Sequence, residues 1–369
     1  MSNKDRNIED VFKSYFDDNK GYRGGKSGDP NKFDKIHKLS SNENPLGCSP
    51  LVQQVIKDRH NAISGYPDAT DLKLREALAK LYDGKLKLNQ LICGNGGSEV
   101  IDWIIKGFVR VGDNVIVSSP FFVPYRSFSM WAGATVVDVP LQPETYAVDV
   151  DGILNAVNDQ TRIVFLTSPN NPSGSYINRS QLEELLDRIP SDVIIAYDEV
   201  YYHFIDQDDY PRAYEYIDRY PNLVGVNSFS KAYGIAGMRI GYGYFSDQVA
   251  AYLRLIVRPF IISRLTLEAA IAAVKDQTWV EKTVANNELG RQYLFEEMSQ
   301  MNVQVYESHG NFIMFKVPGD HLAVFQALAD RGVFIRPLDN YEAPGMLRVS
   351  VGTRENNEAF ISALRKIIS

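Results

Sequence analysis

Short apolar runs alternate with amphipathic stretches through the middle of this sequence of 369 residues. The runs at Val115–Val117, Ile163–Thr167, Val193–Tyr197 and Leu223–Asn227 have the predominantly apolar character of strands buried on both faces of a parallel sheet. Helical patterns such as Arg179–Arg188 lie between some of them. Because parallel strands require long crossover connections, this alternation predicts an α/β fold with a mostly parallel central sheet flanked by helices.

The pattern changes near residue 266, where longer amphipathic segments begin. Helices are predicted over Leu267–Ala285 and Glu288–Met301. Strand-like segments follow at Phe312–Val317, Val333–Ile335 and Leu347–Val351. We expect this part of the chain to form a smaller α+β domain.

The length also indicates two domains, at roughly 150 residues per domain. We expect residues 1–49 to form an N-terminal arm and part of the smaller domain, residues 50–265 to form the large domain, and residues 266–369 to form the small C-terminal domain. A long helix near residues 245–275 is the predicted connector between the two domains.

The charge and cysteine content narrow the class of protein. A formal net charge of −7 argues against nucleic-acid partners, which require a basic face. Cys48 and Cys93 form no disulfide framework, and the five histidines lack the spacing of metal ligands, so we expect no bound metal. The N-terminus is charged throughout, and no uncharged apolar stretch approaches the ~18 residues of a membrane span. We therefore expect a soluble, cytoplasmic protein without a membrane partner.

The most informative motif surrounds Lys231, which follows the predicted strand Leu223–Asn227. A lysine amine with a lowered pKa can serve as an imine-forming nucleophile. Ser228, Ser230 and Arg239 supply hydroxyl and guanidinium donors that suit a phosphate group. The alternative is a surface lysine in a glycine-rich loop.

Two further polar motifs follow predicted strands. Asp198 and Tyr201 come after Val193–Tyr197, at an edge where open α/β sheets bind ligands. An aspartate beside a pyridinium nitrogen would keep that nitrogen protonated. Asn171 lies in the turn SPNNPSG, where its amide can contact a ligand oxygen. The alternatives are a helix cap for Asp198 and a purely structural turn around Asn171.

A glycine-rich turn, Gly94–Gly97, joins a predicted strand at Leu91–Cys93 to a predicted helix that begins at Ser98. The amides of Gly97 and Ser98 at such a helix start form an anion site. The turn fits neither a dinucleotide fingerprint nor a P-loop. Downstream, Tyr125 offers an aromatic face that could stack on a planar ring or pack in the core.

In their order and spacing these motifs resemble those of fold-type I pyridoxal-phosphate (PLP) aminotransferases, of class I and II, from about Tyr22 to the C-terminus. The blocks SPNNPSG, DEVYYHF and SFSKAYGIAGMRIGY carry the resemblance to the superfamily. The blocks KLSSNENPLGCSP and YPDATDLKLREAL point to its histidinol-phosphate aminotransferase branch. The resemblance implies a large PLP-binding domain, a smaller domain, and a homodimer with shared active sites.

The resemblance also implies roles for individual residues in holding the cofactor. Lys231 would form the imine with PLP and later move a proton, while Asp198 would pair with the pyridinium nitrogen. Asn171 and Tyr201 would contact the ring oxygen, and Tyr125 would stack on the ring. The phosphate would be bound by one set of groups, with the last of them reaching across from the neighbouring subunit: Gly97, Ser98, Ser228, Ser230, Arg239 and Tyr66.

Substrate contacts are implied for Tyr22, Asn44, Arg336 and Arg348. An arginine fork can accept either a carboxylate or a phosphate, which suits a small anionic amino donor and a 2-oxo acid. The alternative for Arg336 and Arg348 is surface salt bridging.

The resemblance predicts transfer of an amino group between L-histidinol phosphate and 2-oxoglutarate, giving imidazole-acetol phosphate and glutamate, by a ping-pong mechanism. An aromatic amino acid aminotransferase and a decarboxylase of the threonine-phosphate type are the enzymatic alternatives. A PLP-binding regulator would normally carry a fused DNA-binding module, and the N-terminal arm of 38 residues is too short and not basic enough for one.

Overall fold

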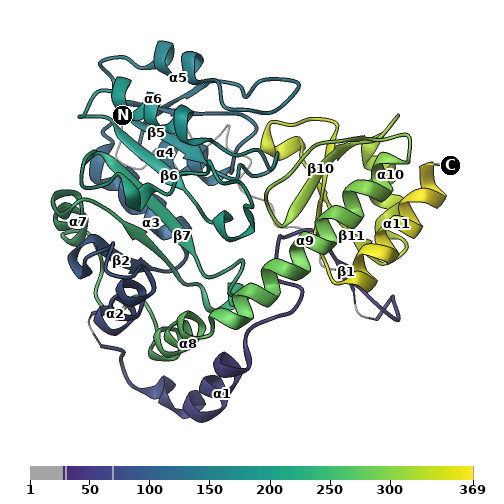
Figure 1. The fold of residues 1–369 in the computed structure, drawn as a ribbon, viewed down its shortest axis with the longest axis horizontal. Coiled ribbons are helices and arrows are strands. Elements are labelled where there is room, and N and C mark those ends of the chain that lie inside the picture. The colour runs from purple at the N-terminus through teal and green to yellow at the C-terminus, as the bar shows by residue number, and fades with distance from the viewer. Residues whose placement is uncertain (1–27, 30, 69, 369) are drawn as a thin grey trace, which may run out of the picture.

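The computed structural model describes residues 28–29, 31–68 and 70–368, which form a larger and a smaller lobe (Figure 1). Within these residues, the larger lobe is centred on a seven-stranded sheet of order β2-β8-β7-β6-β5-β3-β4. Neighbouring strands from β7 to β4 pair in parallel, and β8 is antiparallel to both β7 and β2. The strands are β2 (Leu91–Gly94), β3 (Asn114–Val117), β4 (Thr135–Asp138), β5 (Thr161–Thr167), β6 (Ile194–Asp198), β7 (Leu223–Ser228) and β8 (Gly241–Tyr244).

The sheet is covered on both faces because its central strands are apolar on both sides. Along β5, Ile163 and Phe165 belong to one hydrophobic core, whereas Val164 and Leu166 belong to the other. Helices α3 and α7 contribute to the first core, and α2, α5, α6 and α8 contribute to the second. The helices of this lobe are α1 (Pro50–Arg59), α2 (Leu72–Leu81), α3 (Gly97–Phe108), α4 (Pro124–Trp131), α5 (Val150–Ala156), α6 (Arg179–Arg188), α7 (Asp247–Arg254) and α8 (Arg264–Lys275).

The smaller lobe combines segments from both sides of the larger one. Its four-stranded sheet has the order β12-β13-β10-β9 and is antiparallel, while β1 pairs in parallel with β11. Helix α9 runs from the larger lobe into the smaller one, and α10 and α11 pack together there (Figure 1). The elements are β1 (His37–Lys38), α9 (Gln277–Ser299), β9 (Gln304–Val305), β10 (Phe312–Lys316), α10 (His321–Ala329), β11 (Val333–Phe334), β12 (Arg336–Pro337), β13 (Met346–Ser350) and α11 (Arg354–Ile368).

Short 3₁₀ turns complete the connections. They are η3 (His60–Ser64), η4 (Leu88–Gln90), η5 (Tyr202–Phe204), η6 (Ala213–Glu215), η7 (Ala236–Met238) and η8 (Asp339–Tyr341).

The predicted α/β architecture is confirmed. The four apolar runs form β3, β5, β6 and β7, each within two residues of its predicted ends. Helix α6 spans the predicted residues, because Asn178 and Gln181 form a reciprocal capping box at its start. Strand β8 has no counterpart among the predicted elements, since its alternating glycines weaken the strand pattern.

The predicted connector helix near residues 245–275 is wrong. Pro259 lacks a backbone N–H and disfavours helix at the preceding residue, and Phe260 has a φ of +60°. The segment is therefore divided into α7 and α8, and the long helix that joins the lobes is α9. Helix α8 packs on α1 and α2 of the larger lobe. The division into domains at residues 49/50 and 265/266 stays a prediction, and these contacts favour a second boundary close to the start of α9.

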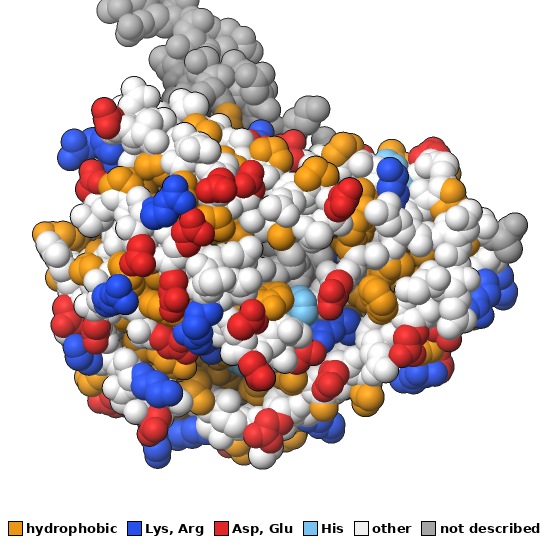
Figure 2. Space-filling model, turned by 45° about the horizontal axis from the view of Figure 1, so that its top comes forward, with side chains coloured by type: hydrophobic (Ala, Val, Ile, Leu, Met, Phe, Trp, Pro, Cys, Tyr) orange, Lys and Arg blue, Asp and Glu red, His pale blue; other side chains and the backbone are white. Residues whose placement is uncertain are grey.

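Acidic and basic side chains are interspersed on the face that Figure 2 shows, without a broad patch of one sign. In the part of the chain that the structure describes, no helix is both long enough and apolar enough to cross a membrane.

Candidate active site

A cavity of about 480 Å³ lies at the carboxyl ends of the sheet strands, and side chains of the smaller lobe close part of its wall. Thr167, Asp198 and Ser228 are the last residues of β5, β6 and β7. Thr167 lies directly opposite Asp198 in the β5–β6 register. Most of the residues predicted from the sequence line this cavity, namely Gly97, Ser98, Asn171, Asp198, Tyr201, Ser228, Ser230, Lys231, Arg239 and Arg348.

Lys231 lies in the loop after β7, with its amine at the cavity wall. Its Nζ donates to the backbone oxygen of Ser41 at 3.3 Å and lies 5.3 Å from the centre of the Tyr201 ring. Burial, with the nearby Arg348 guanidinium, lowers the pKa of Lys231 from 10.5 to about 8. A larger fraction of the amine is therefore uncharged and nucleophilic near neutral pH.

Asp198 ends β6 and is only 6% exposed. Its Oδ2 accepts a hydrogen bond from the Tyr125 hydroxyl at 2.7 Å, and its Oδ1 accepts one from the amide of Val200 at 3.1 Å. Burial raises the pKa of Asp198 to about 6, against the opposing effect of these hydrogen bonds and of Lys231. Among the residues that the structure describes, no basic side chain forms an ion pair with Asp198, so the carboxylate can receive a cationic group in the cavity.

An anion-binding cradle lies at the start of α3. Gly97 and Ser98 begin this helix, whose unpaired amides and dipole favour a negative charge. The side chain of Arg239 crosses the preceding residue so closely that a Cβ on Gly96 would lie 2.8 Å from its Nη2. The φ of +84° at Gly96 favours glycine there, whereas the flexible end of the Arg239 side chain can shift away from a Cβ. Ser228 and Ser230 complete the cradle.

Arg348 reaches the cavity from β13 of the smaller lobe and is 3% exposed. Its guanidinium donates through Nη1 to Oδ1 of Asn171 and through Nη2 to the backbone oxygen of Ser40 at 3.1 Å. Its buried Nε has no hydrogen-bond partner among the described residues. This arrangement contradicts the alternative of a surface salt bridge for Arg348.

Arg336 is directly opposite Arg348 in the β12–β13 pairing. It is also buried, and its Nη2 donates to the Tyr341 hydroxyl at 3.3 Å. The Tyr341 ring lies 5.4 Å from the Arg336 guanidinium and 5.6 Å from that of Arg348. Arg336 therefore stands behind Tyr341, which lines the cavity itself.

Tyr201 presents its hydroxyl to the cavity and accepts a hydrogen bond from Nδ2 of Asn42 at 3.1 Å. Burial raises the pKa of Tyr201 to about 12, so the phenol stays protonated. Asn42 is a lining residue that sequence reasoning missed, although it lies in the same block as the predicted Asn44.

The position of Asn44 corrects the prediction for that residue. Asn44 does not line the cavity. Its Nδ2 donates to the backbone oxygen of Ala232 and to the Thr283 hydroxyl, and its Oδ1 accepts from the amide of Leu46. The side chain thus ties the 44–47 turn to neighbouring elements and has no polar atom directed at a substrate.

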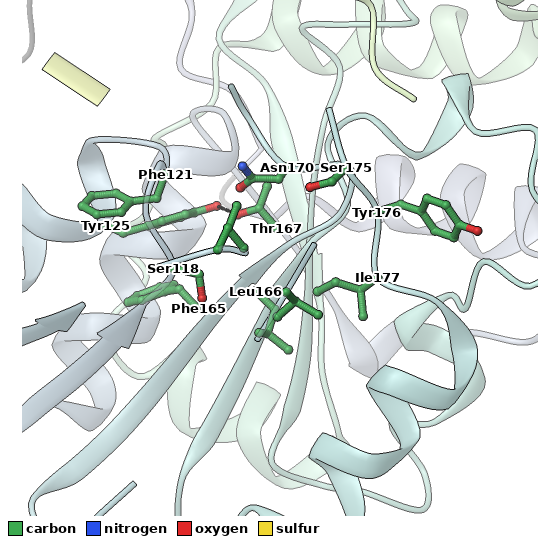
Figure 3. A pocket seen from close by; sticks show the side chains of 12 residues that line it. Ser118, Phe121, Tyr125, Phe165, Leu166, Thr167, Asn170, Ser175, Tyr176 and Ile177 are labelled. Carbon is green, nitrogen blue, oxygen red and sulfur yellow. Dashed lines mark hydrogen bonds between the residues drawn. The ribbon is translucent and has the colours of Figure 1, made fainter. Parts of the chain in front are cut away.

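The position of Tyr125 requires a second correction. Its ring is stacked on Phe165 at 4.6 Å, and its hydroxyl is directed toward Thr167, as Figure 3 shows. Tyr125 is therefore packed behind Asp198 and does not line the cavity. The aromatic side chain on the cavity wall near it is Phe122, which meets the Tyr125 ring edge-on at 5.6 Å.

Tyr66, also predicted from the sequence, does not line this cavity. Tyr66 is 80% exposed and packs against Phe260 at 5.2 Å. Tyr22 lies outside the described residues.

Comparisons with known proteins identify the family of this chain. The profile of the family described as aminotransferase class I and II matches residues 34–364. Histidinol-phosphate aminotransferase of Anoxybacillus flavithermus is 37% identical over 339 residues, which cover 91% of this chain and 90% of the relative.

Solved structures share the fold. Histidinol-phosphate aminotransferase from Sinorhizobium meliloti, in complex with pyridoxal-5'-phosphate, has a TM-score of 0.86 at 24% identity and covers 97% of each chain. L-threonine-O-3-phosphate decarboxylase from Porphyromonas gingivalis has a TM-score of 0.78 at 22% identity, over 89% of this chain and 98% of its own. The fold alone therefore accommodates more than one reaction. The profile match spans almost the whole described chain, and the chain belongs to the aminotransferase class I and II family.

Proposed function

We propose that this PLP-dependent aminotransferase transfers an amino group between L-histidinol phosphate and 2-oxoglutarate, giving imidazole-acetol phosphate and glutamate, by a ping-pong mechanism. The observation that carries the proposal is the joint exposure of the Lys231 amine, the Asp198 carboxylate and the cradle at α3 to one cavity. The substrate assignment is supported by relatives named histidinol-phosphate aminotransferases, which match nine-tenths of the chain.

The residues present fit PLP in three separate respects. The amides of Gly97 and Ser98, together with Ser228, Ser230 and Arg239, match its phosphate group. The buried carboxylate of Asp198 matches the protonated nitrogen of its ring, and the amine of Lys231 matches its aldehyde. A cavity of about 480 Å³ is also within the usual size of cofactor sites.

When bound, PLP supplies a carbonyl carbon for exchange of amino groups and a ring that withdraws electrons. Asp198 would hold the proton of the ring nitrogen and so strengthen that withdrawal. Lys231, released with a lowered pKa, would take the proton from the substrate Cα and return one to the cofactor carbon. Tyr201 and Asn171 would donate to the ring oxygen, and Phe122 would fix the plane of the ring.

Arg348 would hold the anionic end of the substrate. Its guanidinium already has two planar donors directed toward acceptors and a third without a partner. A fork of this shape can bind the carboxylate of glutamate or the phosphate of histidinol phosphate in turn. Arg336, which lies behind Tyr341 on the neighbouring strand β12, would add a second positive charge near the same anion.

A homodimer with shared active sites is a further part of the proposal. The exposed rings of Tyr66 and Phe260 lie 5.2 Å apart, and Ile63, three residues before Tyr66, is also exposed in the isolated chain. Exposed apolar residues that gather in one region are typical of a surface that a partner covers. A partner there would allow Tyr66 to reach the phosphate of the neighbouring cofactor. The cytoplasmic location stays a prediction.

The cofactor assignment predicts a near-visible absorbance band for the protein with PLP, which depends on Lys231. Replacing Lys231 by alanine should abolish the band, because the amine that bonds to the aldehyde is removed. Lys275→Ala, at the exposed end of α8, is the matched control and should keep it. A wild-type protein that stays colourless after PLP is added would contradict the assignment.

The substrate assignment predicts that histidinol phosphate is turned over faster than phenylalanine when 2-oxoglutarate is the acceptor, because the anionic end meets Arg348. Steady-state kcat/KM values for histidinol phosphate, phenylalanine and threonine phosphate, measured side by side, provide the check. Equal or better turnover of phenylalanine would favour an aromatic aminotransferase instead. Release of CO2 from threonine phosphate without an acceptor would favour the decarboxylase.

Arg348→Lys should lower kcat/KM by roughly a hundredfold for both glutamate and histidinol phosphate, since a lysine cannot reproduce two charge-assisted hydrogen bonds. The PLP absorbance band should be retained. Arg365→Lys, an exposed position on α11, should change kcat/KM less than about twofold. A change of less than about threefold for Arg348→Lys would show that the anion binds elsewhere.

The shared active site predicts complementation between two impaired chains. In a protein co-expressed from Lys231→Ala and Tyr66→Ala chains, half of the dimers are mixed and each mixed dimer has one intact site. Activity at limiting PLP should therefore return to about a quarter of the wild-type value. A chain with both substitutions, co-expressed with the wild-type chain, should form mixed dimers that have no intact site. Lack of recovery in mixed dimers confirmed by mass would contradict the shared site.

A further inference from the structure

The Asp198 carboxylate is held from outside the active-site cavity by a tyrosine. The hydroxyl of Tyr125, on α4, lies 2.7 Å from Oδ2 of Asp198 and 2.8 Å from Oγ1 of Thr167 (Figure 3 shows Tyr125 and Thr167). Tyr125 is 2% exposed. Its one hydroxyl proton must serve the carboxylate, which can only accept when ionised. The Thr167 hydroxyl therefore donates to the Tyr125 oxygen, and the three side chains form a directed chain of hydrogen bonds.

Packing holds each member of this chain in place. The Tyr125 ring is stacked on Phe165 with an interplanar angle of 10° and meets Phe122 edge-on. Phe165 and Thr167 lie two residues apart on β5, and Thr167 is opposite Asp198 on β6. The only freedom left to the hydroxyl is rotation about its C–O bond, so its proton remains directed at the carboxylate.

Little space for water is left beside Tyr125 and Thr167. The void beside Tyr125, lined in part by Ser118, Thr167 and Asn170, measures about 20 Å³ (Figure 3). That is room for about one water molecule. A hydrogen bond to an ion in such a dry environment is stronger than the same bond in water.

We infer that Tyr125 is a positioning residue of this enzyme, whose hydroxyl, supported by Thr167, keeps Asp198 ionised and directed into the cavity. The inference rests on the proposed function in that Asp198 is taken to pair with the ring nitrogen of PLP. Tyr125 touches neither the cofactor nor the substrate. Through its ring it also supports Phe122, so one side chain orients both the carboxylate and the aromatic wall.

The consequence concerns the protonation of Asp198. The groups that face the carboxylate are Tyr125, the amide of Val200 and the more distant Lys231, and all three lower its pKa against the effect of burial. Removing the Tyr125 hydroxyl should raise the pKa of Asp198 above 6. A larger fraction of the carboxyl would then be neutral near pH 7 and unable to pair with a cation.

The first arm of the test uses the protein without PLP. In the wild type the pKa of Asp198 is higher when folded than when unfolded, so the favourable contribution of this group is complete below about pH 4 and is lost as the pH rises through about 6. In Tyr125→Phe the loss should extend to higher pH. The shift in denaturation midpoint between Tyr125→Phe and wild type should therefore grow from pH 5 to pH 8. In an Asp198→Asn background the shift should be the same at both pH values.

The second arm uses the protein with PLP. Tyr125→Phe should weaken PLP binding roughly tenfold at pH 7.5 and lower kcat by a similar factor, with KM changed less than about twofold. Tyr242→Phe, which removes the hydroxyl of another buried tyrosine bonded at 2.8 Å to Tyr82, is the matched control and should change PLP affinity less than about twofold. In the Asp198→Asn background the effect of Tyr125→Phe on affinity should disappear.

Unchanged PLP affinity in Tyr125→Phe, or an effect of equal size in the Asp198→Asn background, would overturn the inference. If Tyr125→Phe does not fold, Thr167→Val and Thr167→Ser decide the question. Serine should preserve the affinity and valine should weaken it about threefold, whereas equal affinities would overturn the inference. A wild type that binds no PLP would refute the proposed function, and the pH dependence of the first arm would still test the role of Tyr125.

Discussion

A carboxylate buried at the end of a parallel strand is costly, on the order of several kcal/mol, unless donors or a cation surround it. Asp198 meets that condition with the Tyr125 hydroxyl and the Val200 amide on the protein side. The cavity side is left for a cationic group, with Lys231 as the nearest basic residue that affects its pKa. A cation on the cavity side would offset the cost of burying this carboxylate, so Asp198 is suited to pair with a protonated ring nitrogen.

The parallel sheet places the other groups around that carboxylate. Because β5, β6 and β7 run in one direction, their last residues meet at one edge, where Thr167, Asp198 and Ser228 lie. The next residues along each loop then include Asn171, Tyr201 and Lys231, and the start of α3 faces them. Because β5, β6 and β7 are neighbours in the sheet, the loops that follow them also lie side by side around the cavity. The antiparallel β8 lets Arg239 return to the same edge after β7.

Strands β3, β5, β6 and β7 and most of the residues that line the cavity could be predicted, because an apolar run followed by a polar motif indicates the end of a buried strand. Side-chain direction could not be predicted in the same way. Tyr125 and Phe122 lie three residues apart around the start of α4, and only the packing of the ring against Phe165 decides which of them lines the cavity. Asn42 lines the cavity and Asn44 does not, because the Asn44 side chain donates to the backbone oxygen of Ala232. The prediction of one connector helix was wrong because Pro259 and the positive φ of Phe260 interrupt the helix, although the sequence has a helical pattern on both sides of them.

Arg348 couples the two lobes through the groups that a substrate anion would approach. One of its nitrogens donates to Asn171 of the larger lobe, and another donates to Ser40, near β1. An anion that takes up Nη1 or Nη2 would replace one of these contacts. In the proposed function, Arg348 would therefore link anion binding to the contacts between the two lobes. In the proposed reaction, the carboxylate of one substrate and the phosphate of the other would bind in turn at this guanidinium.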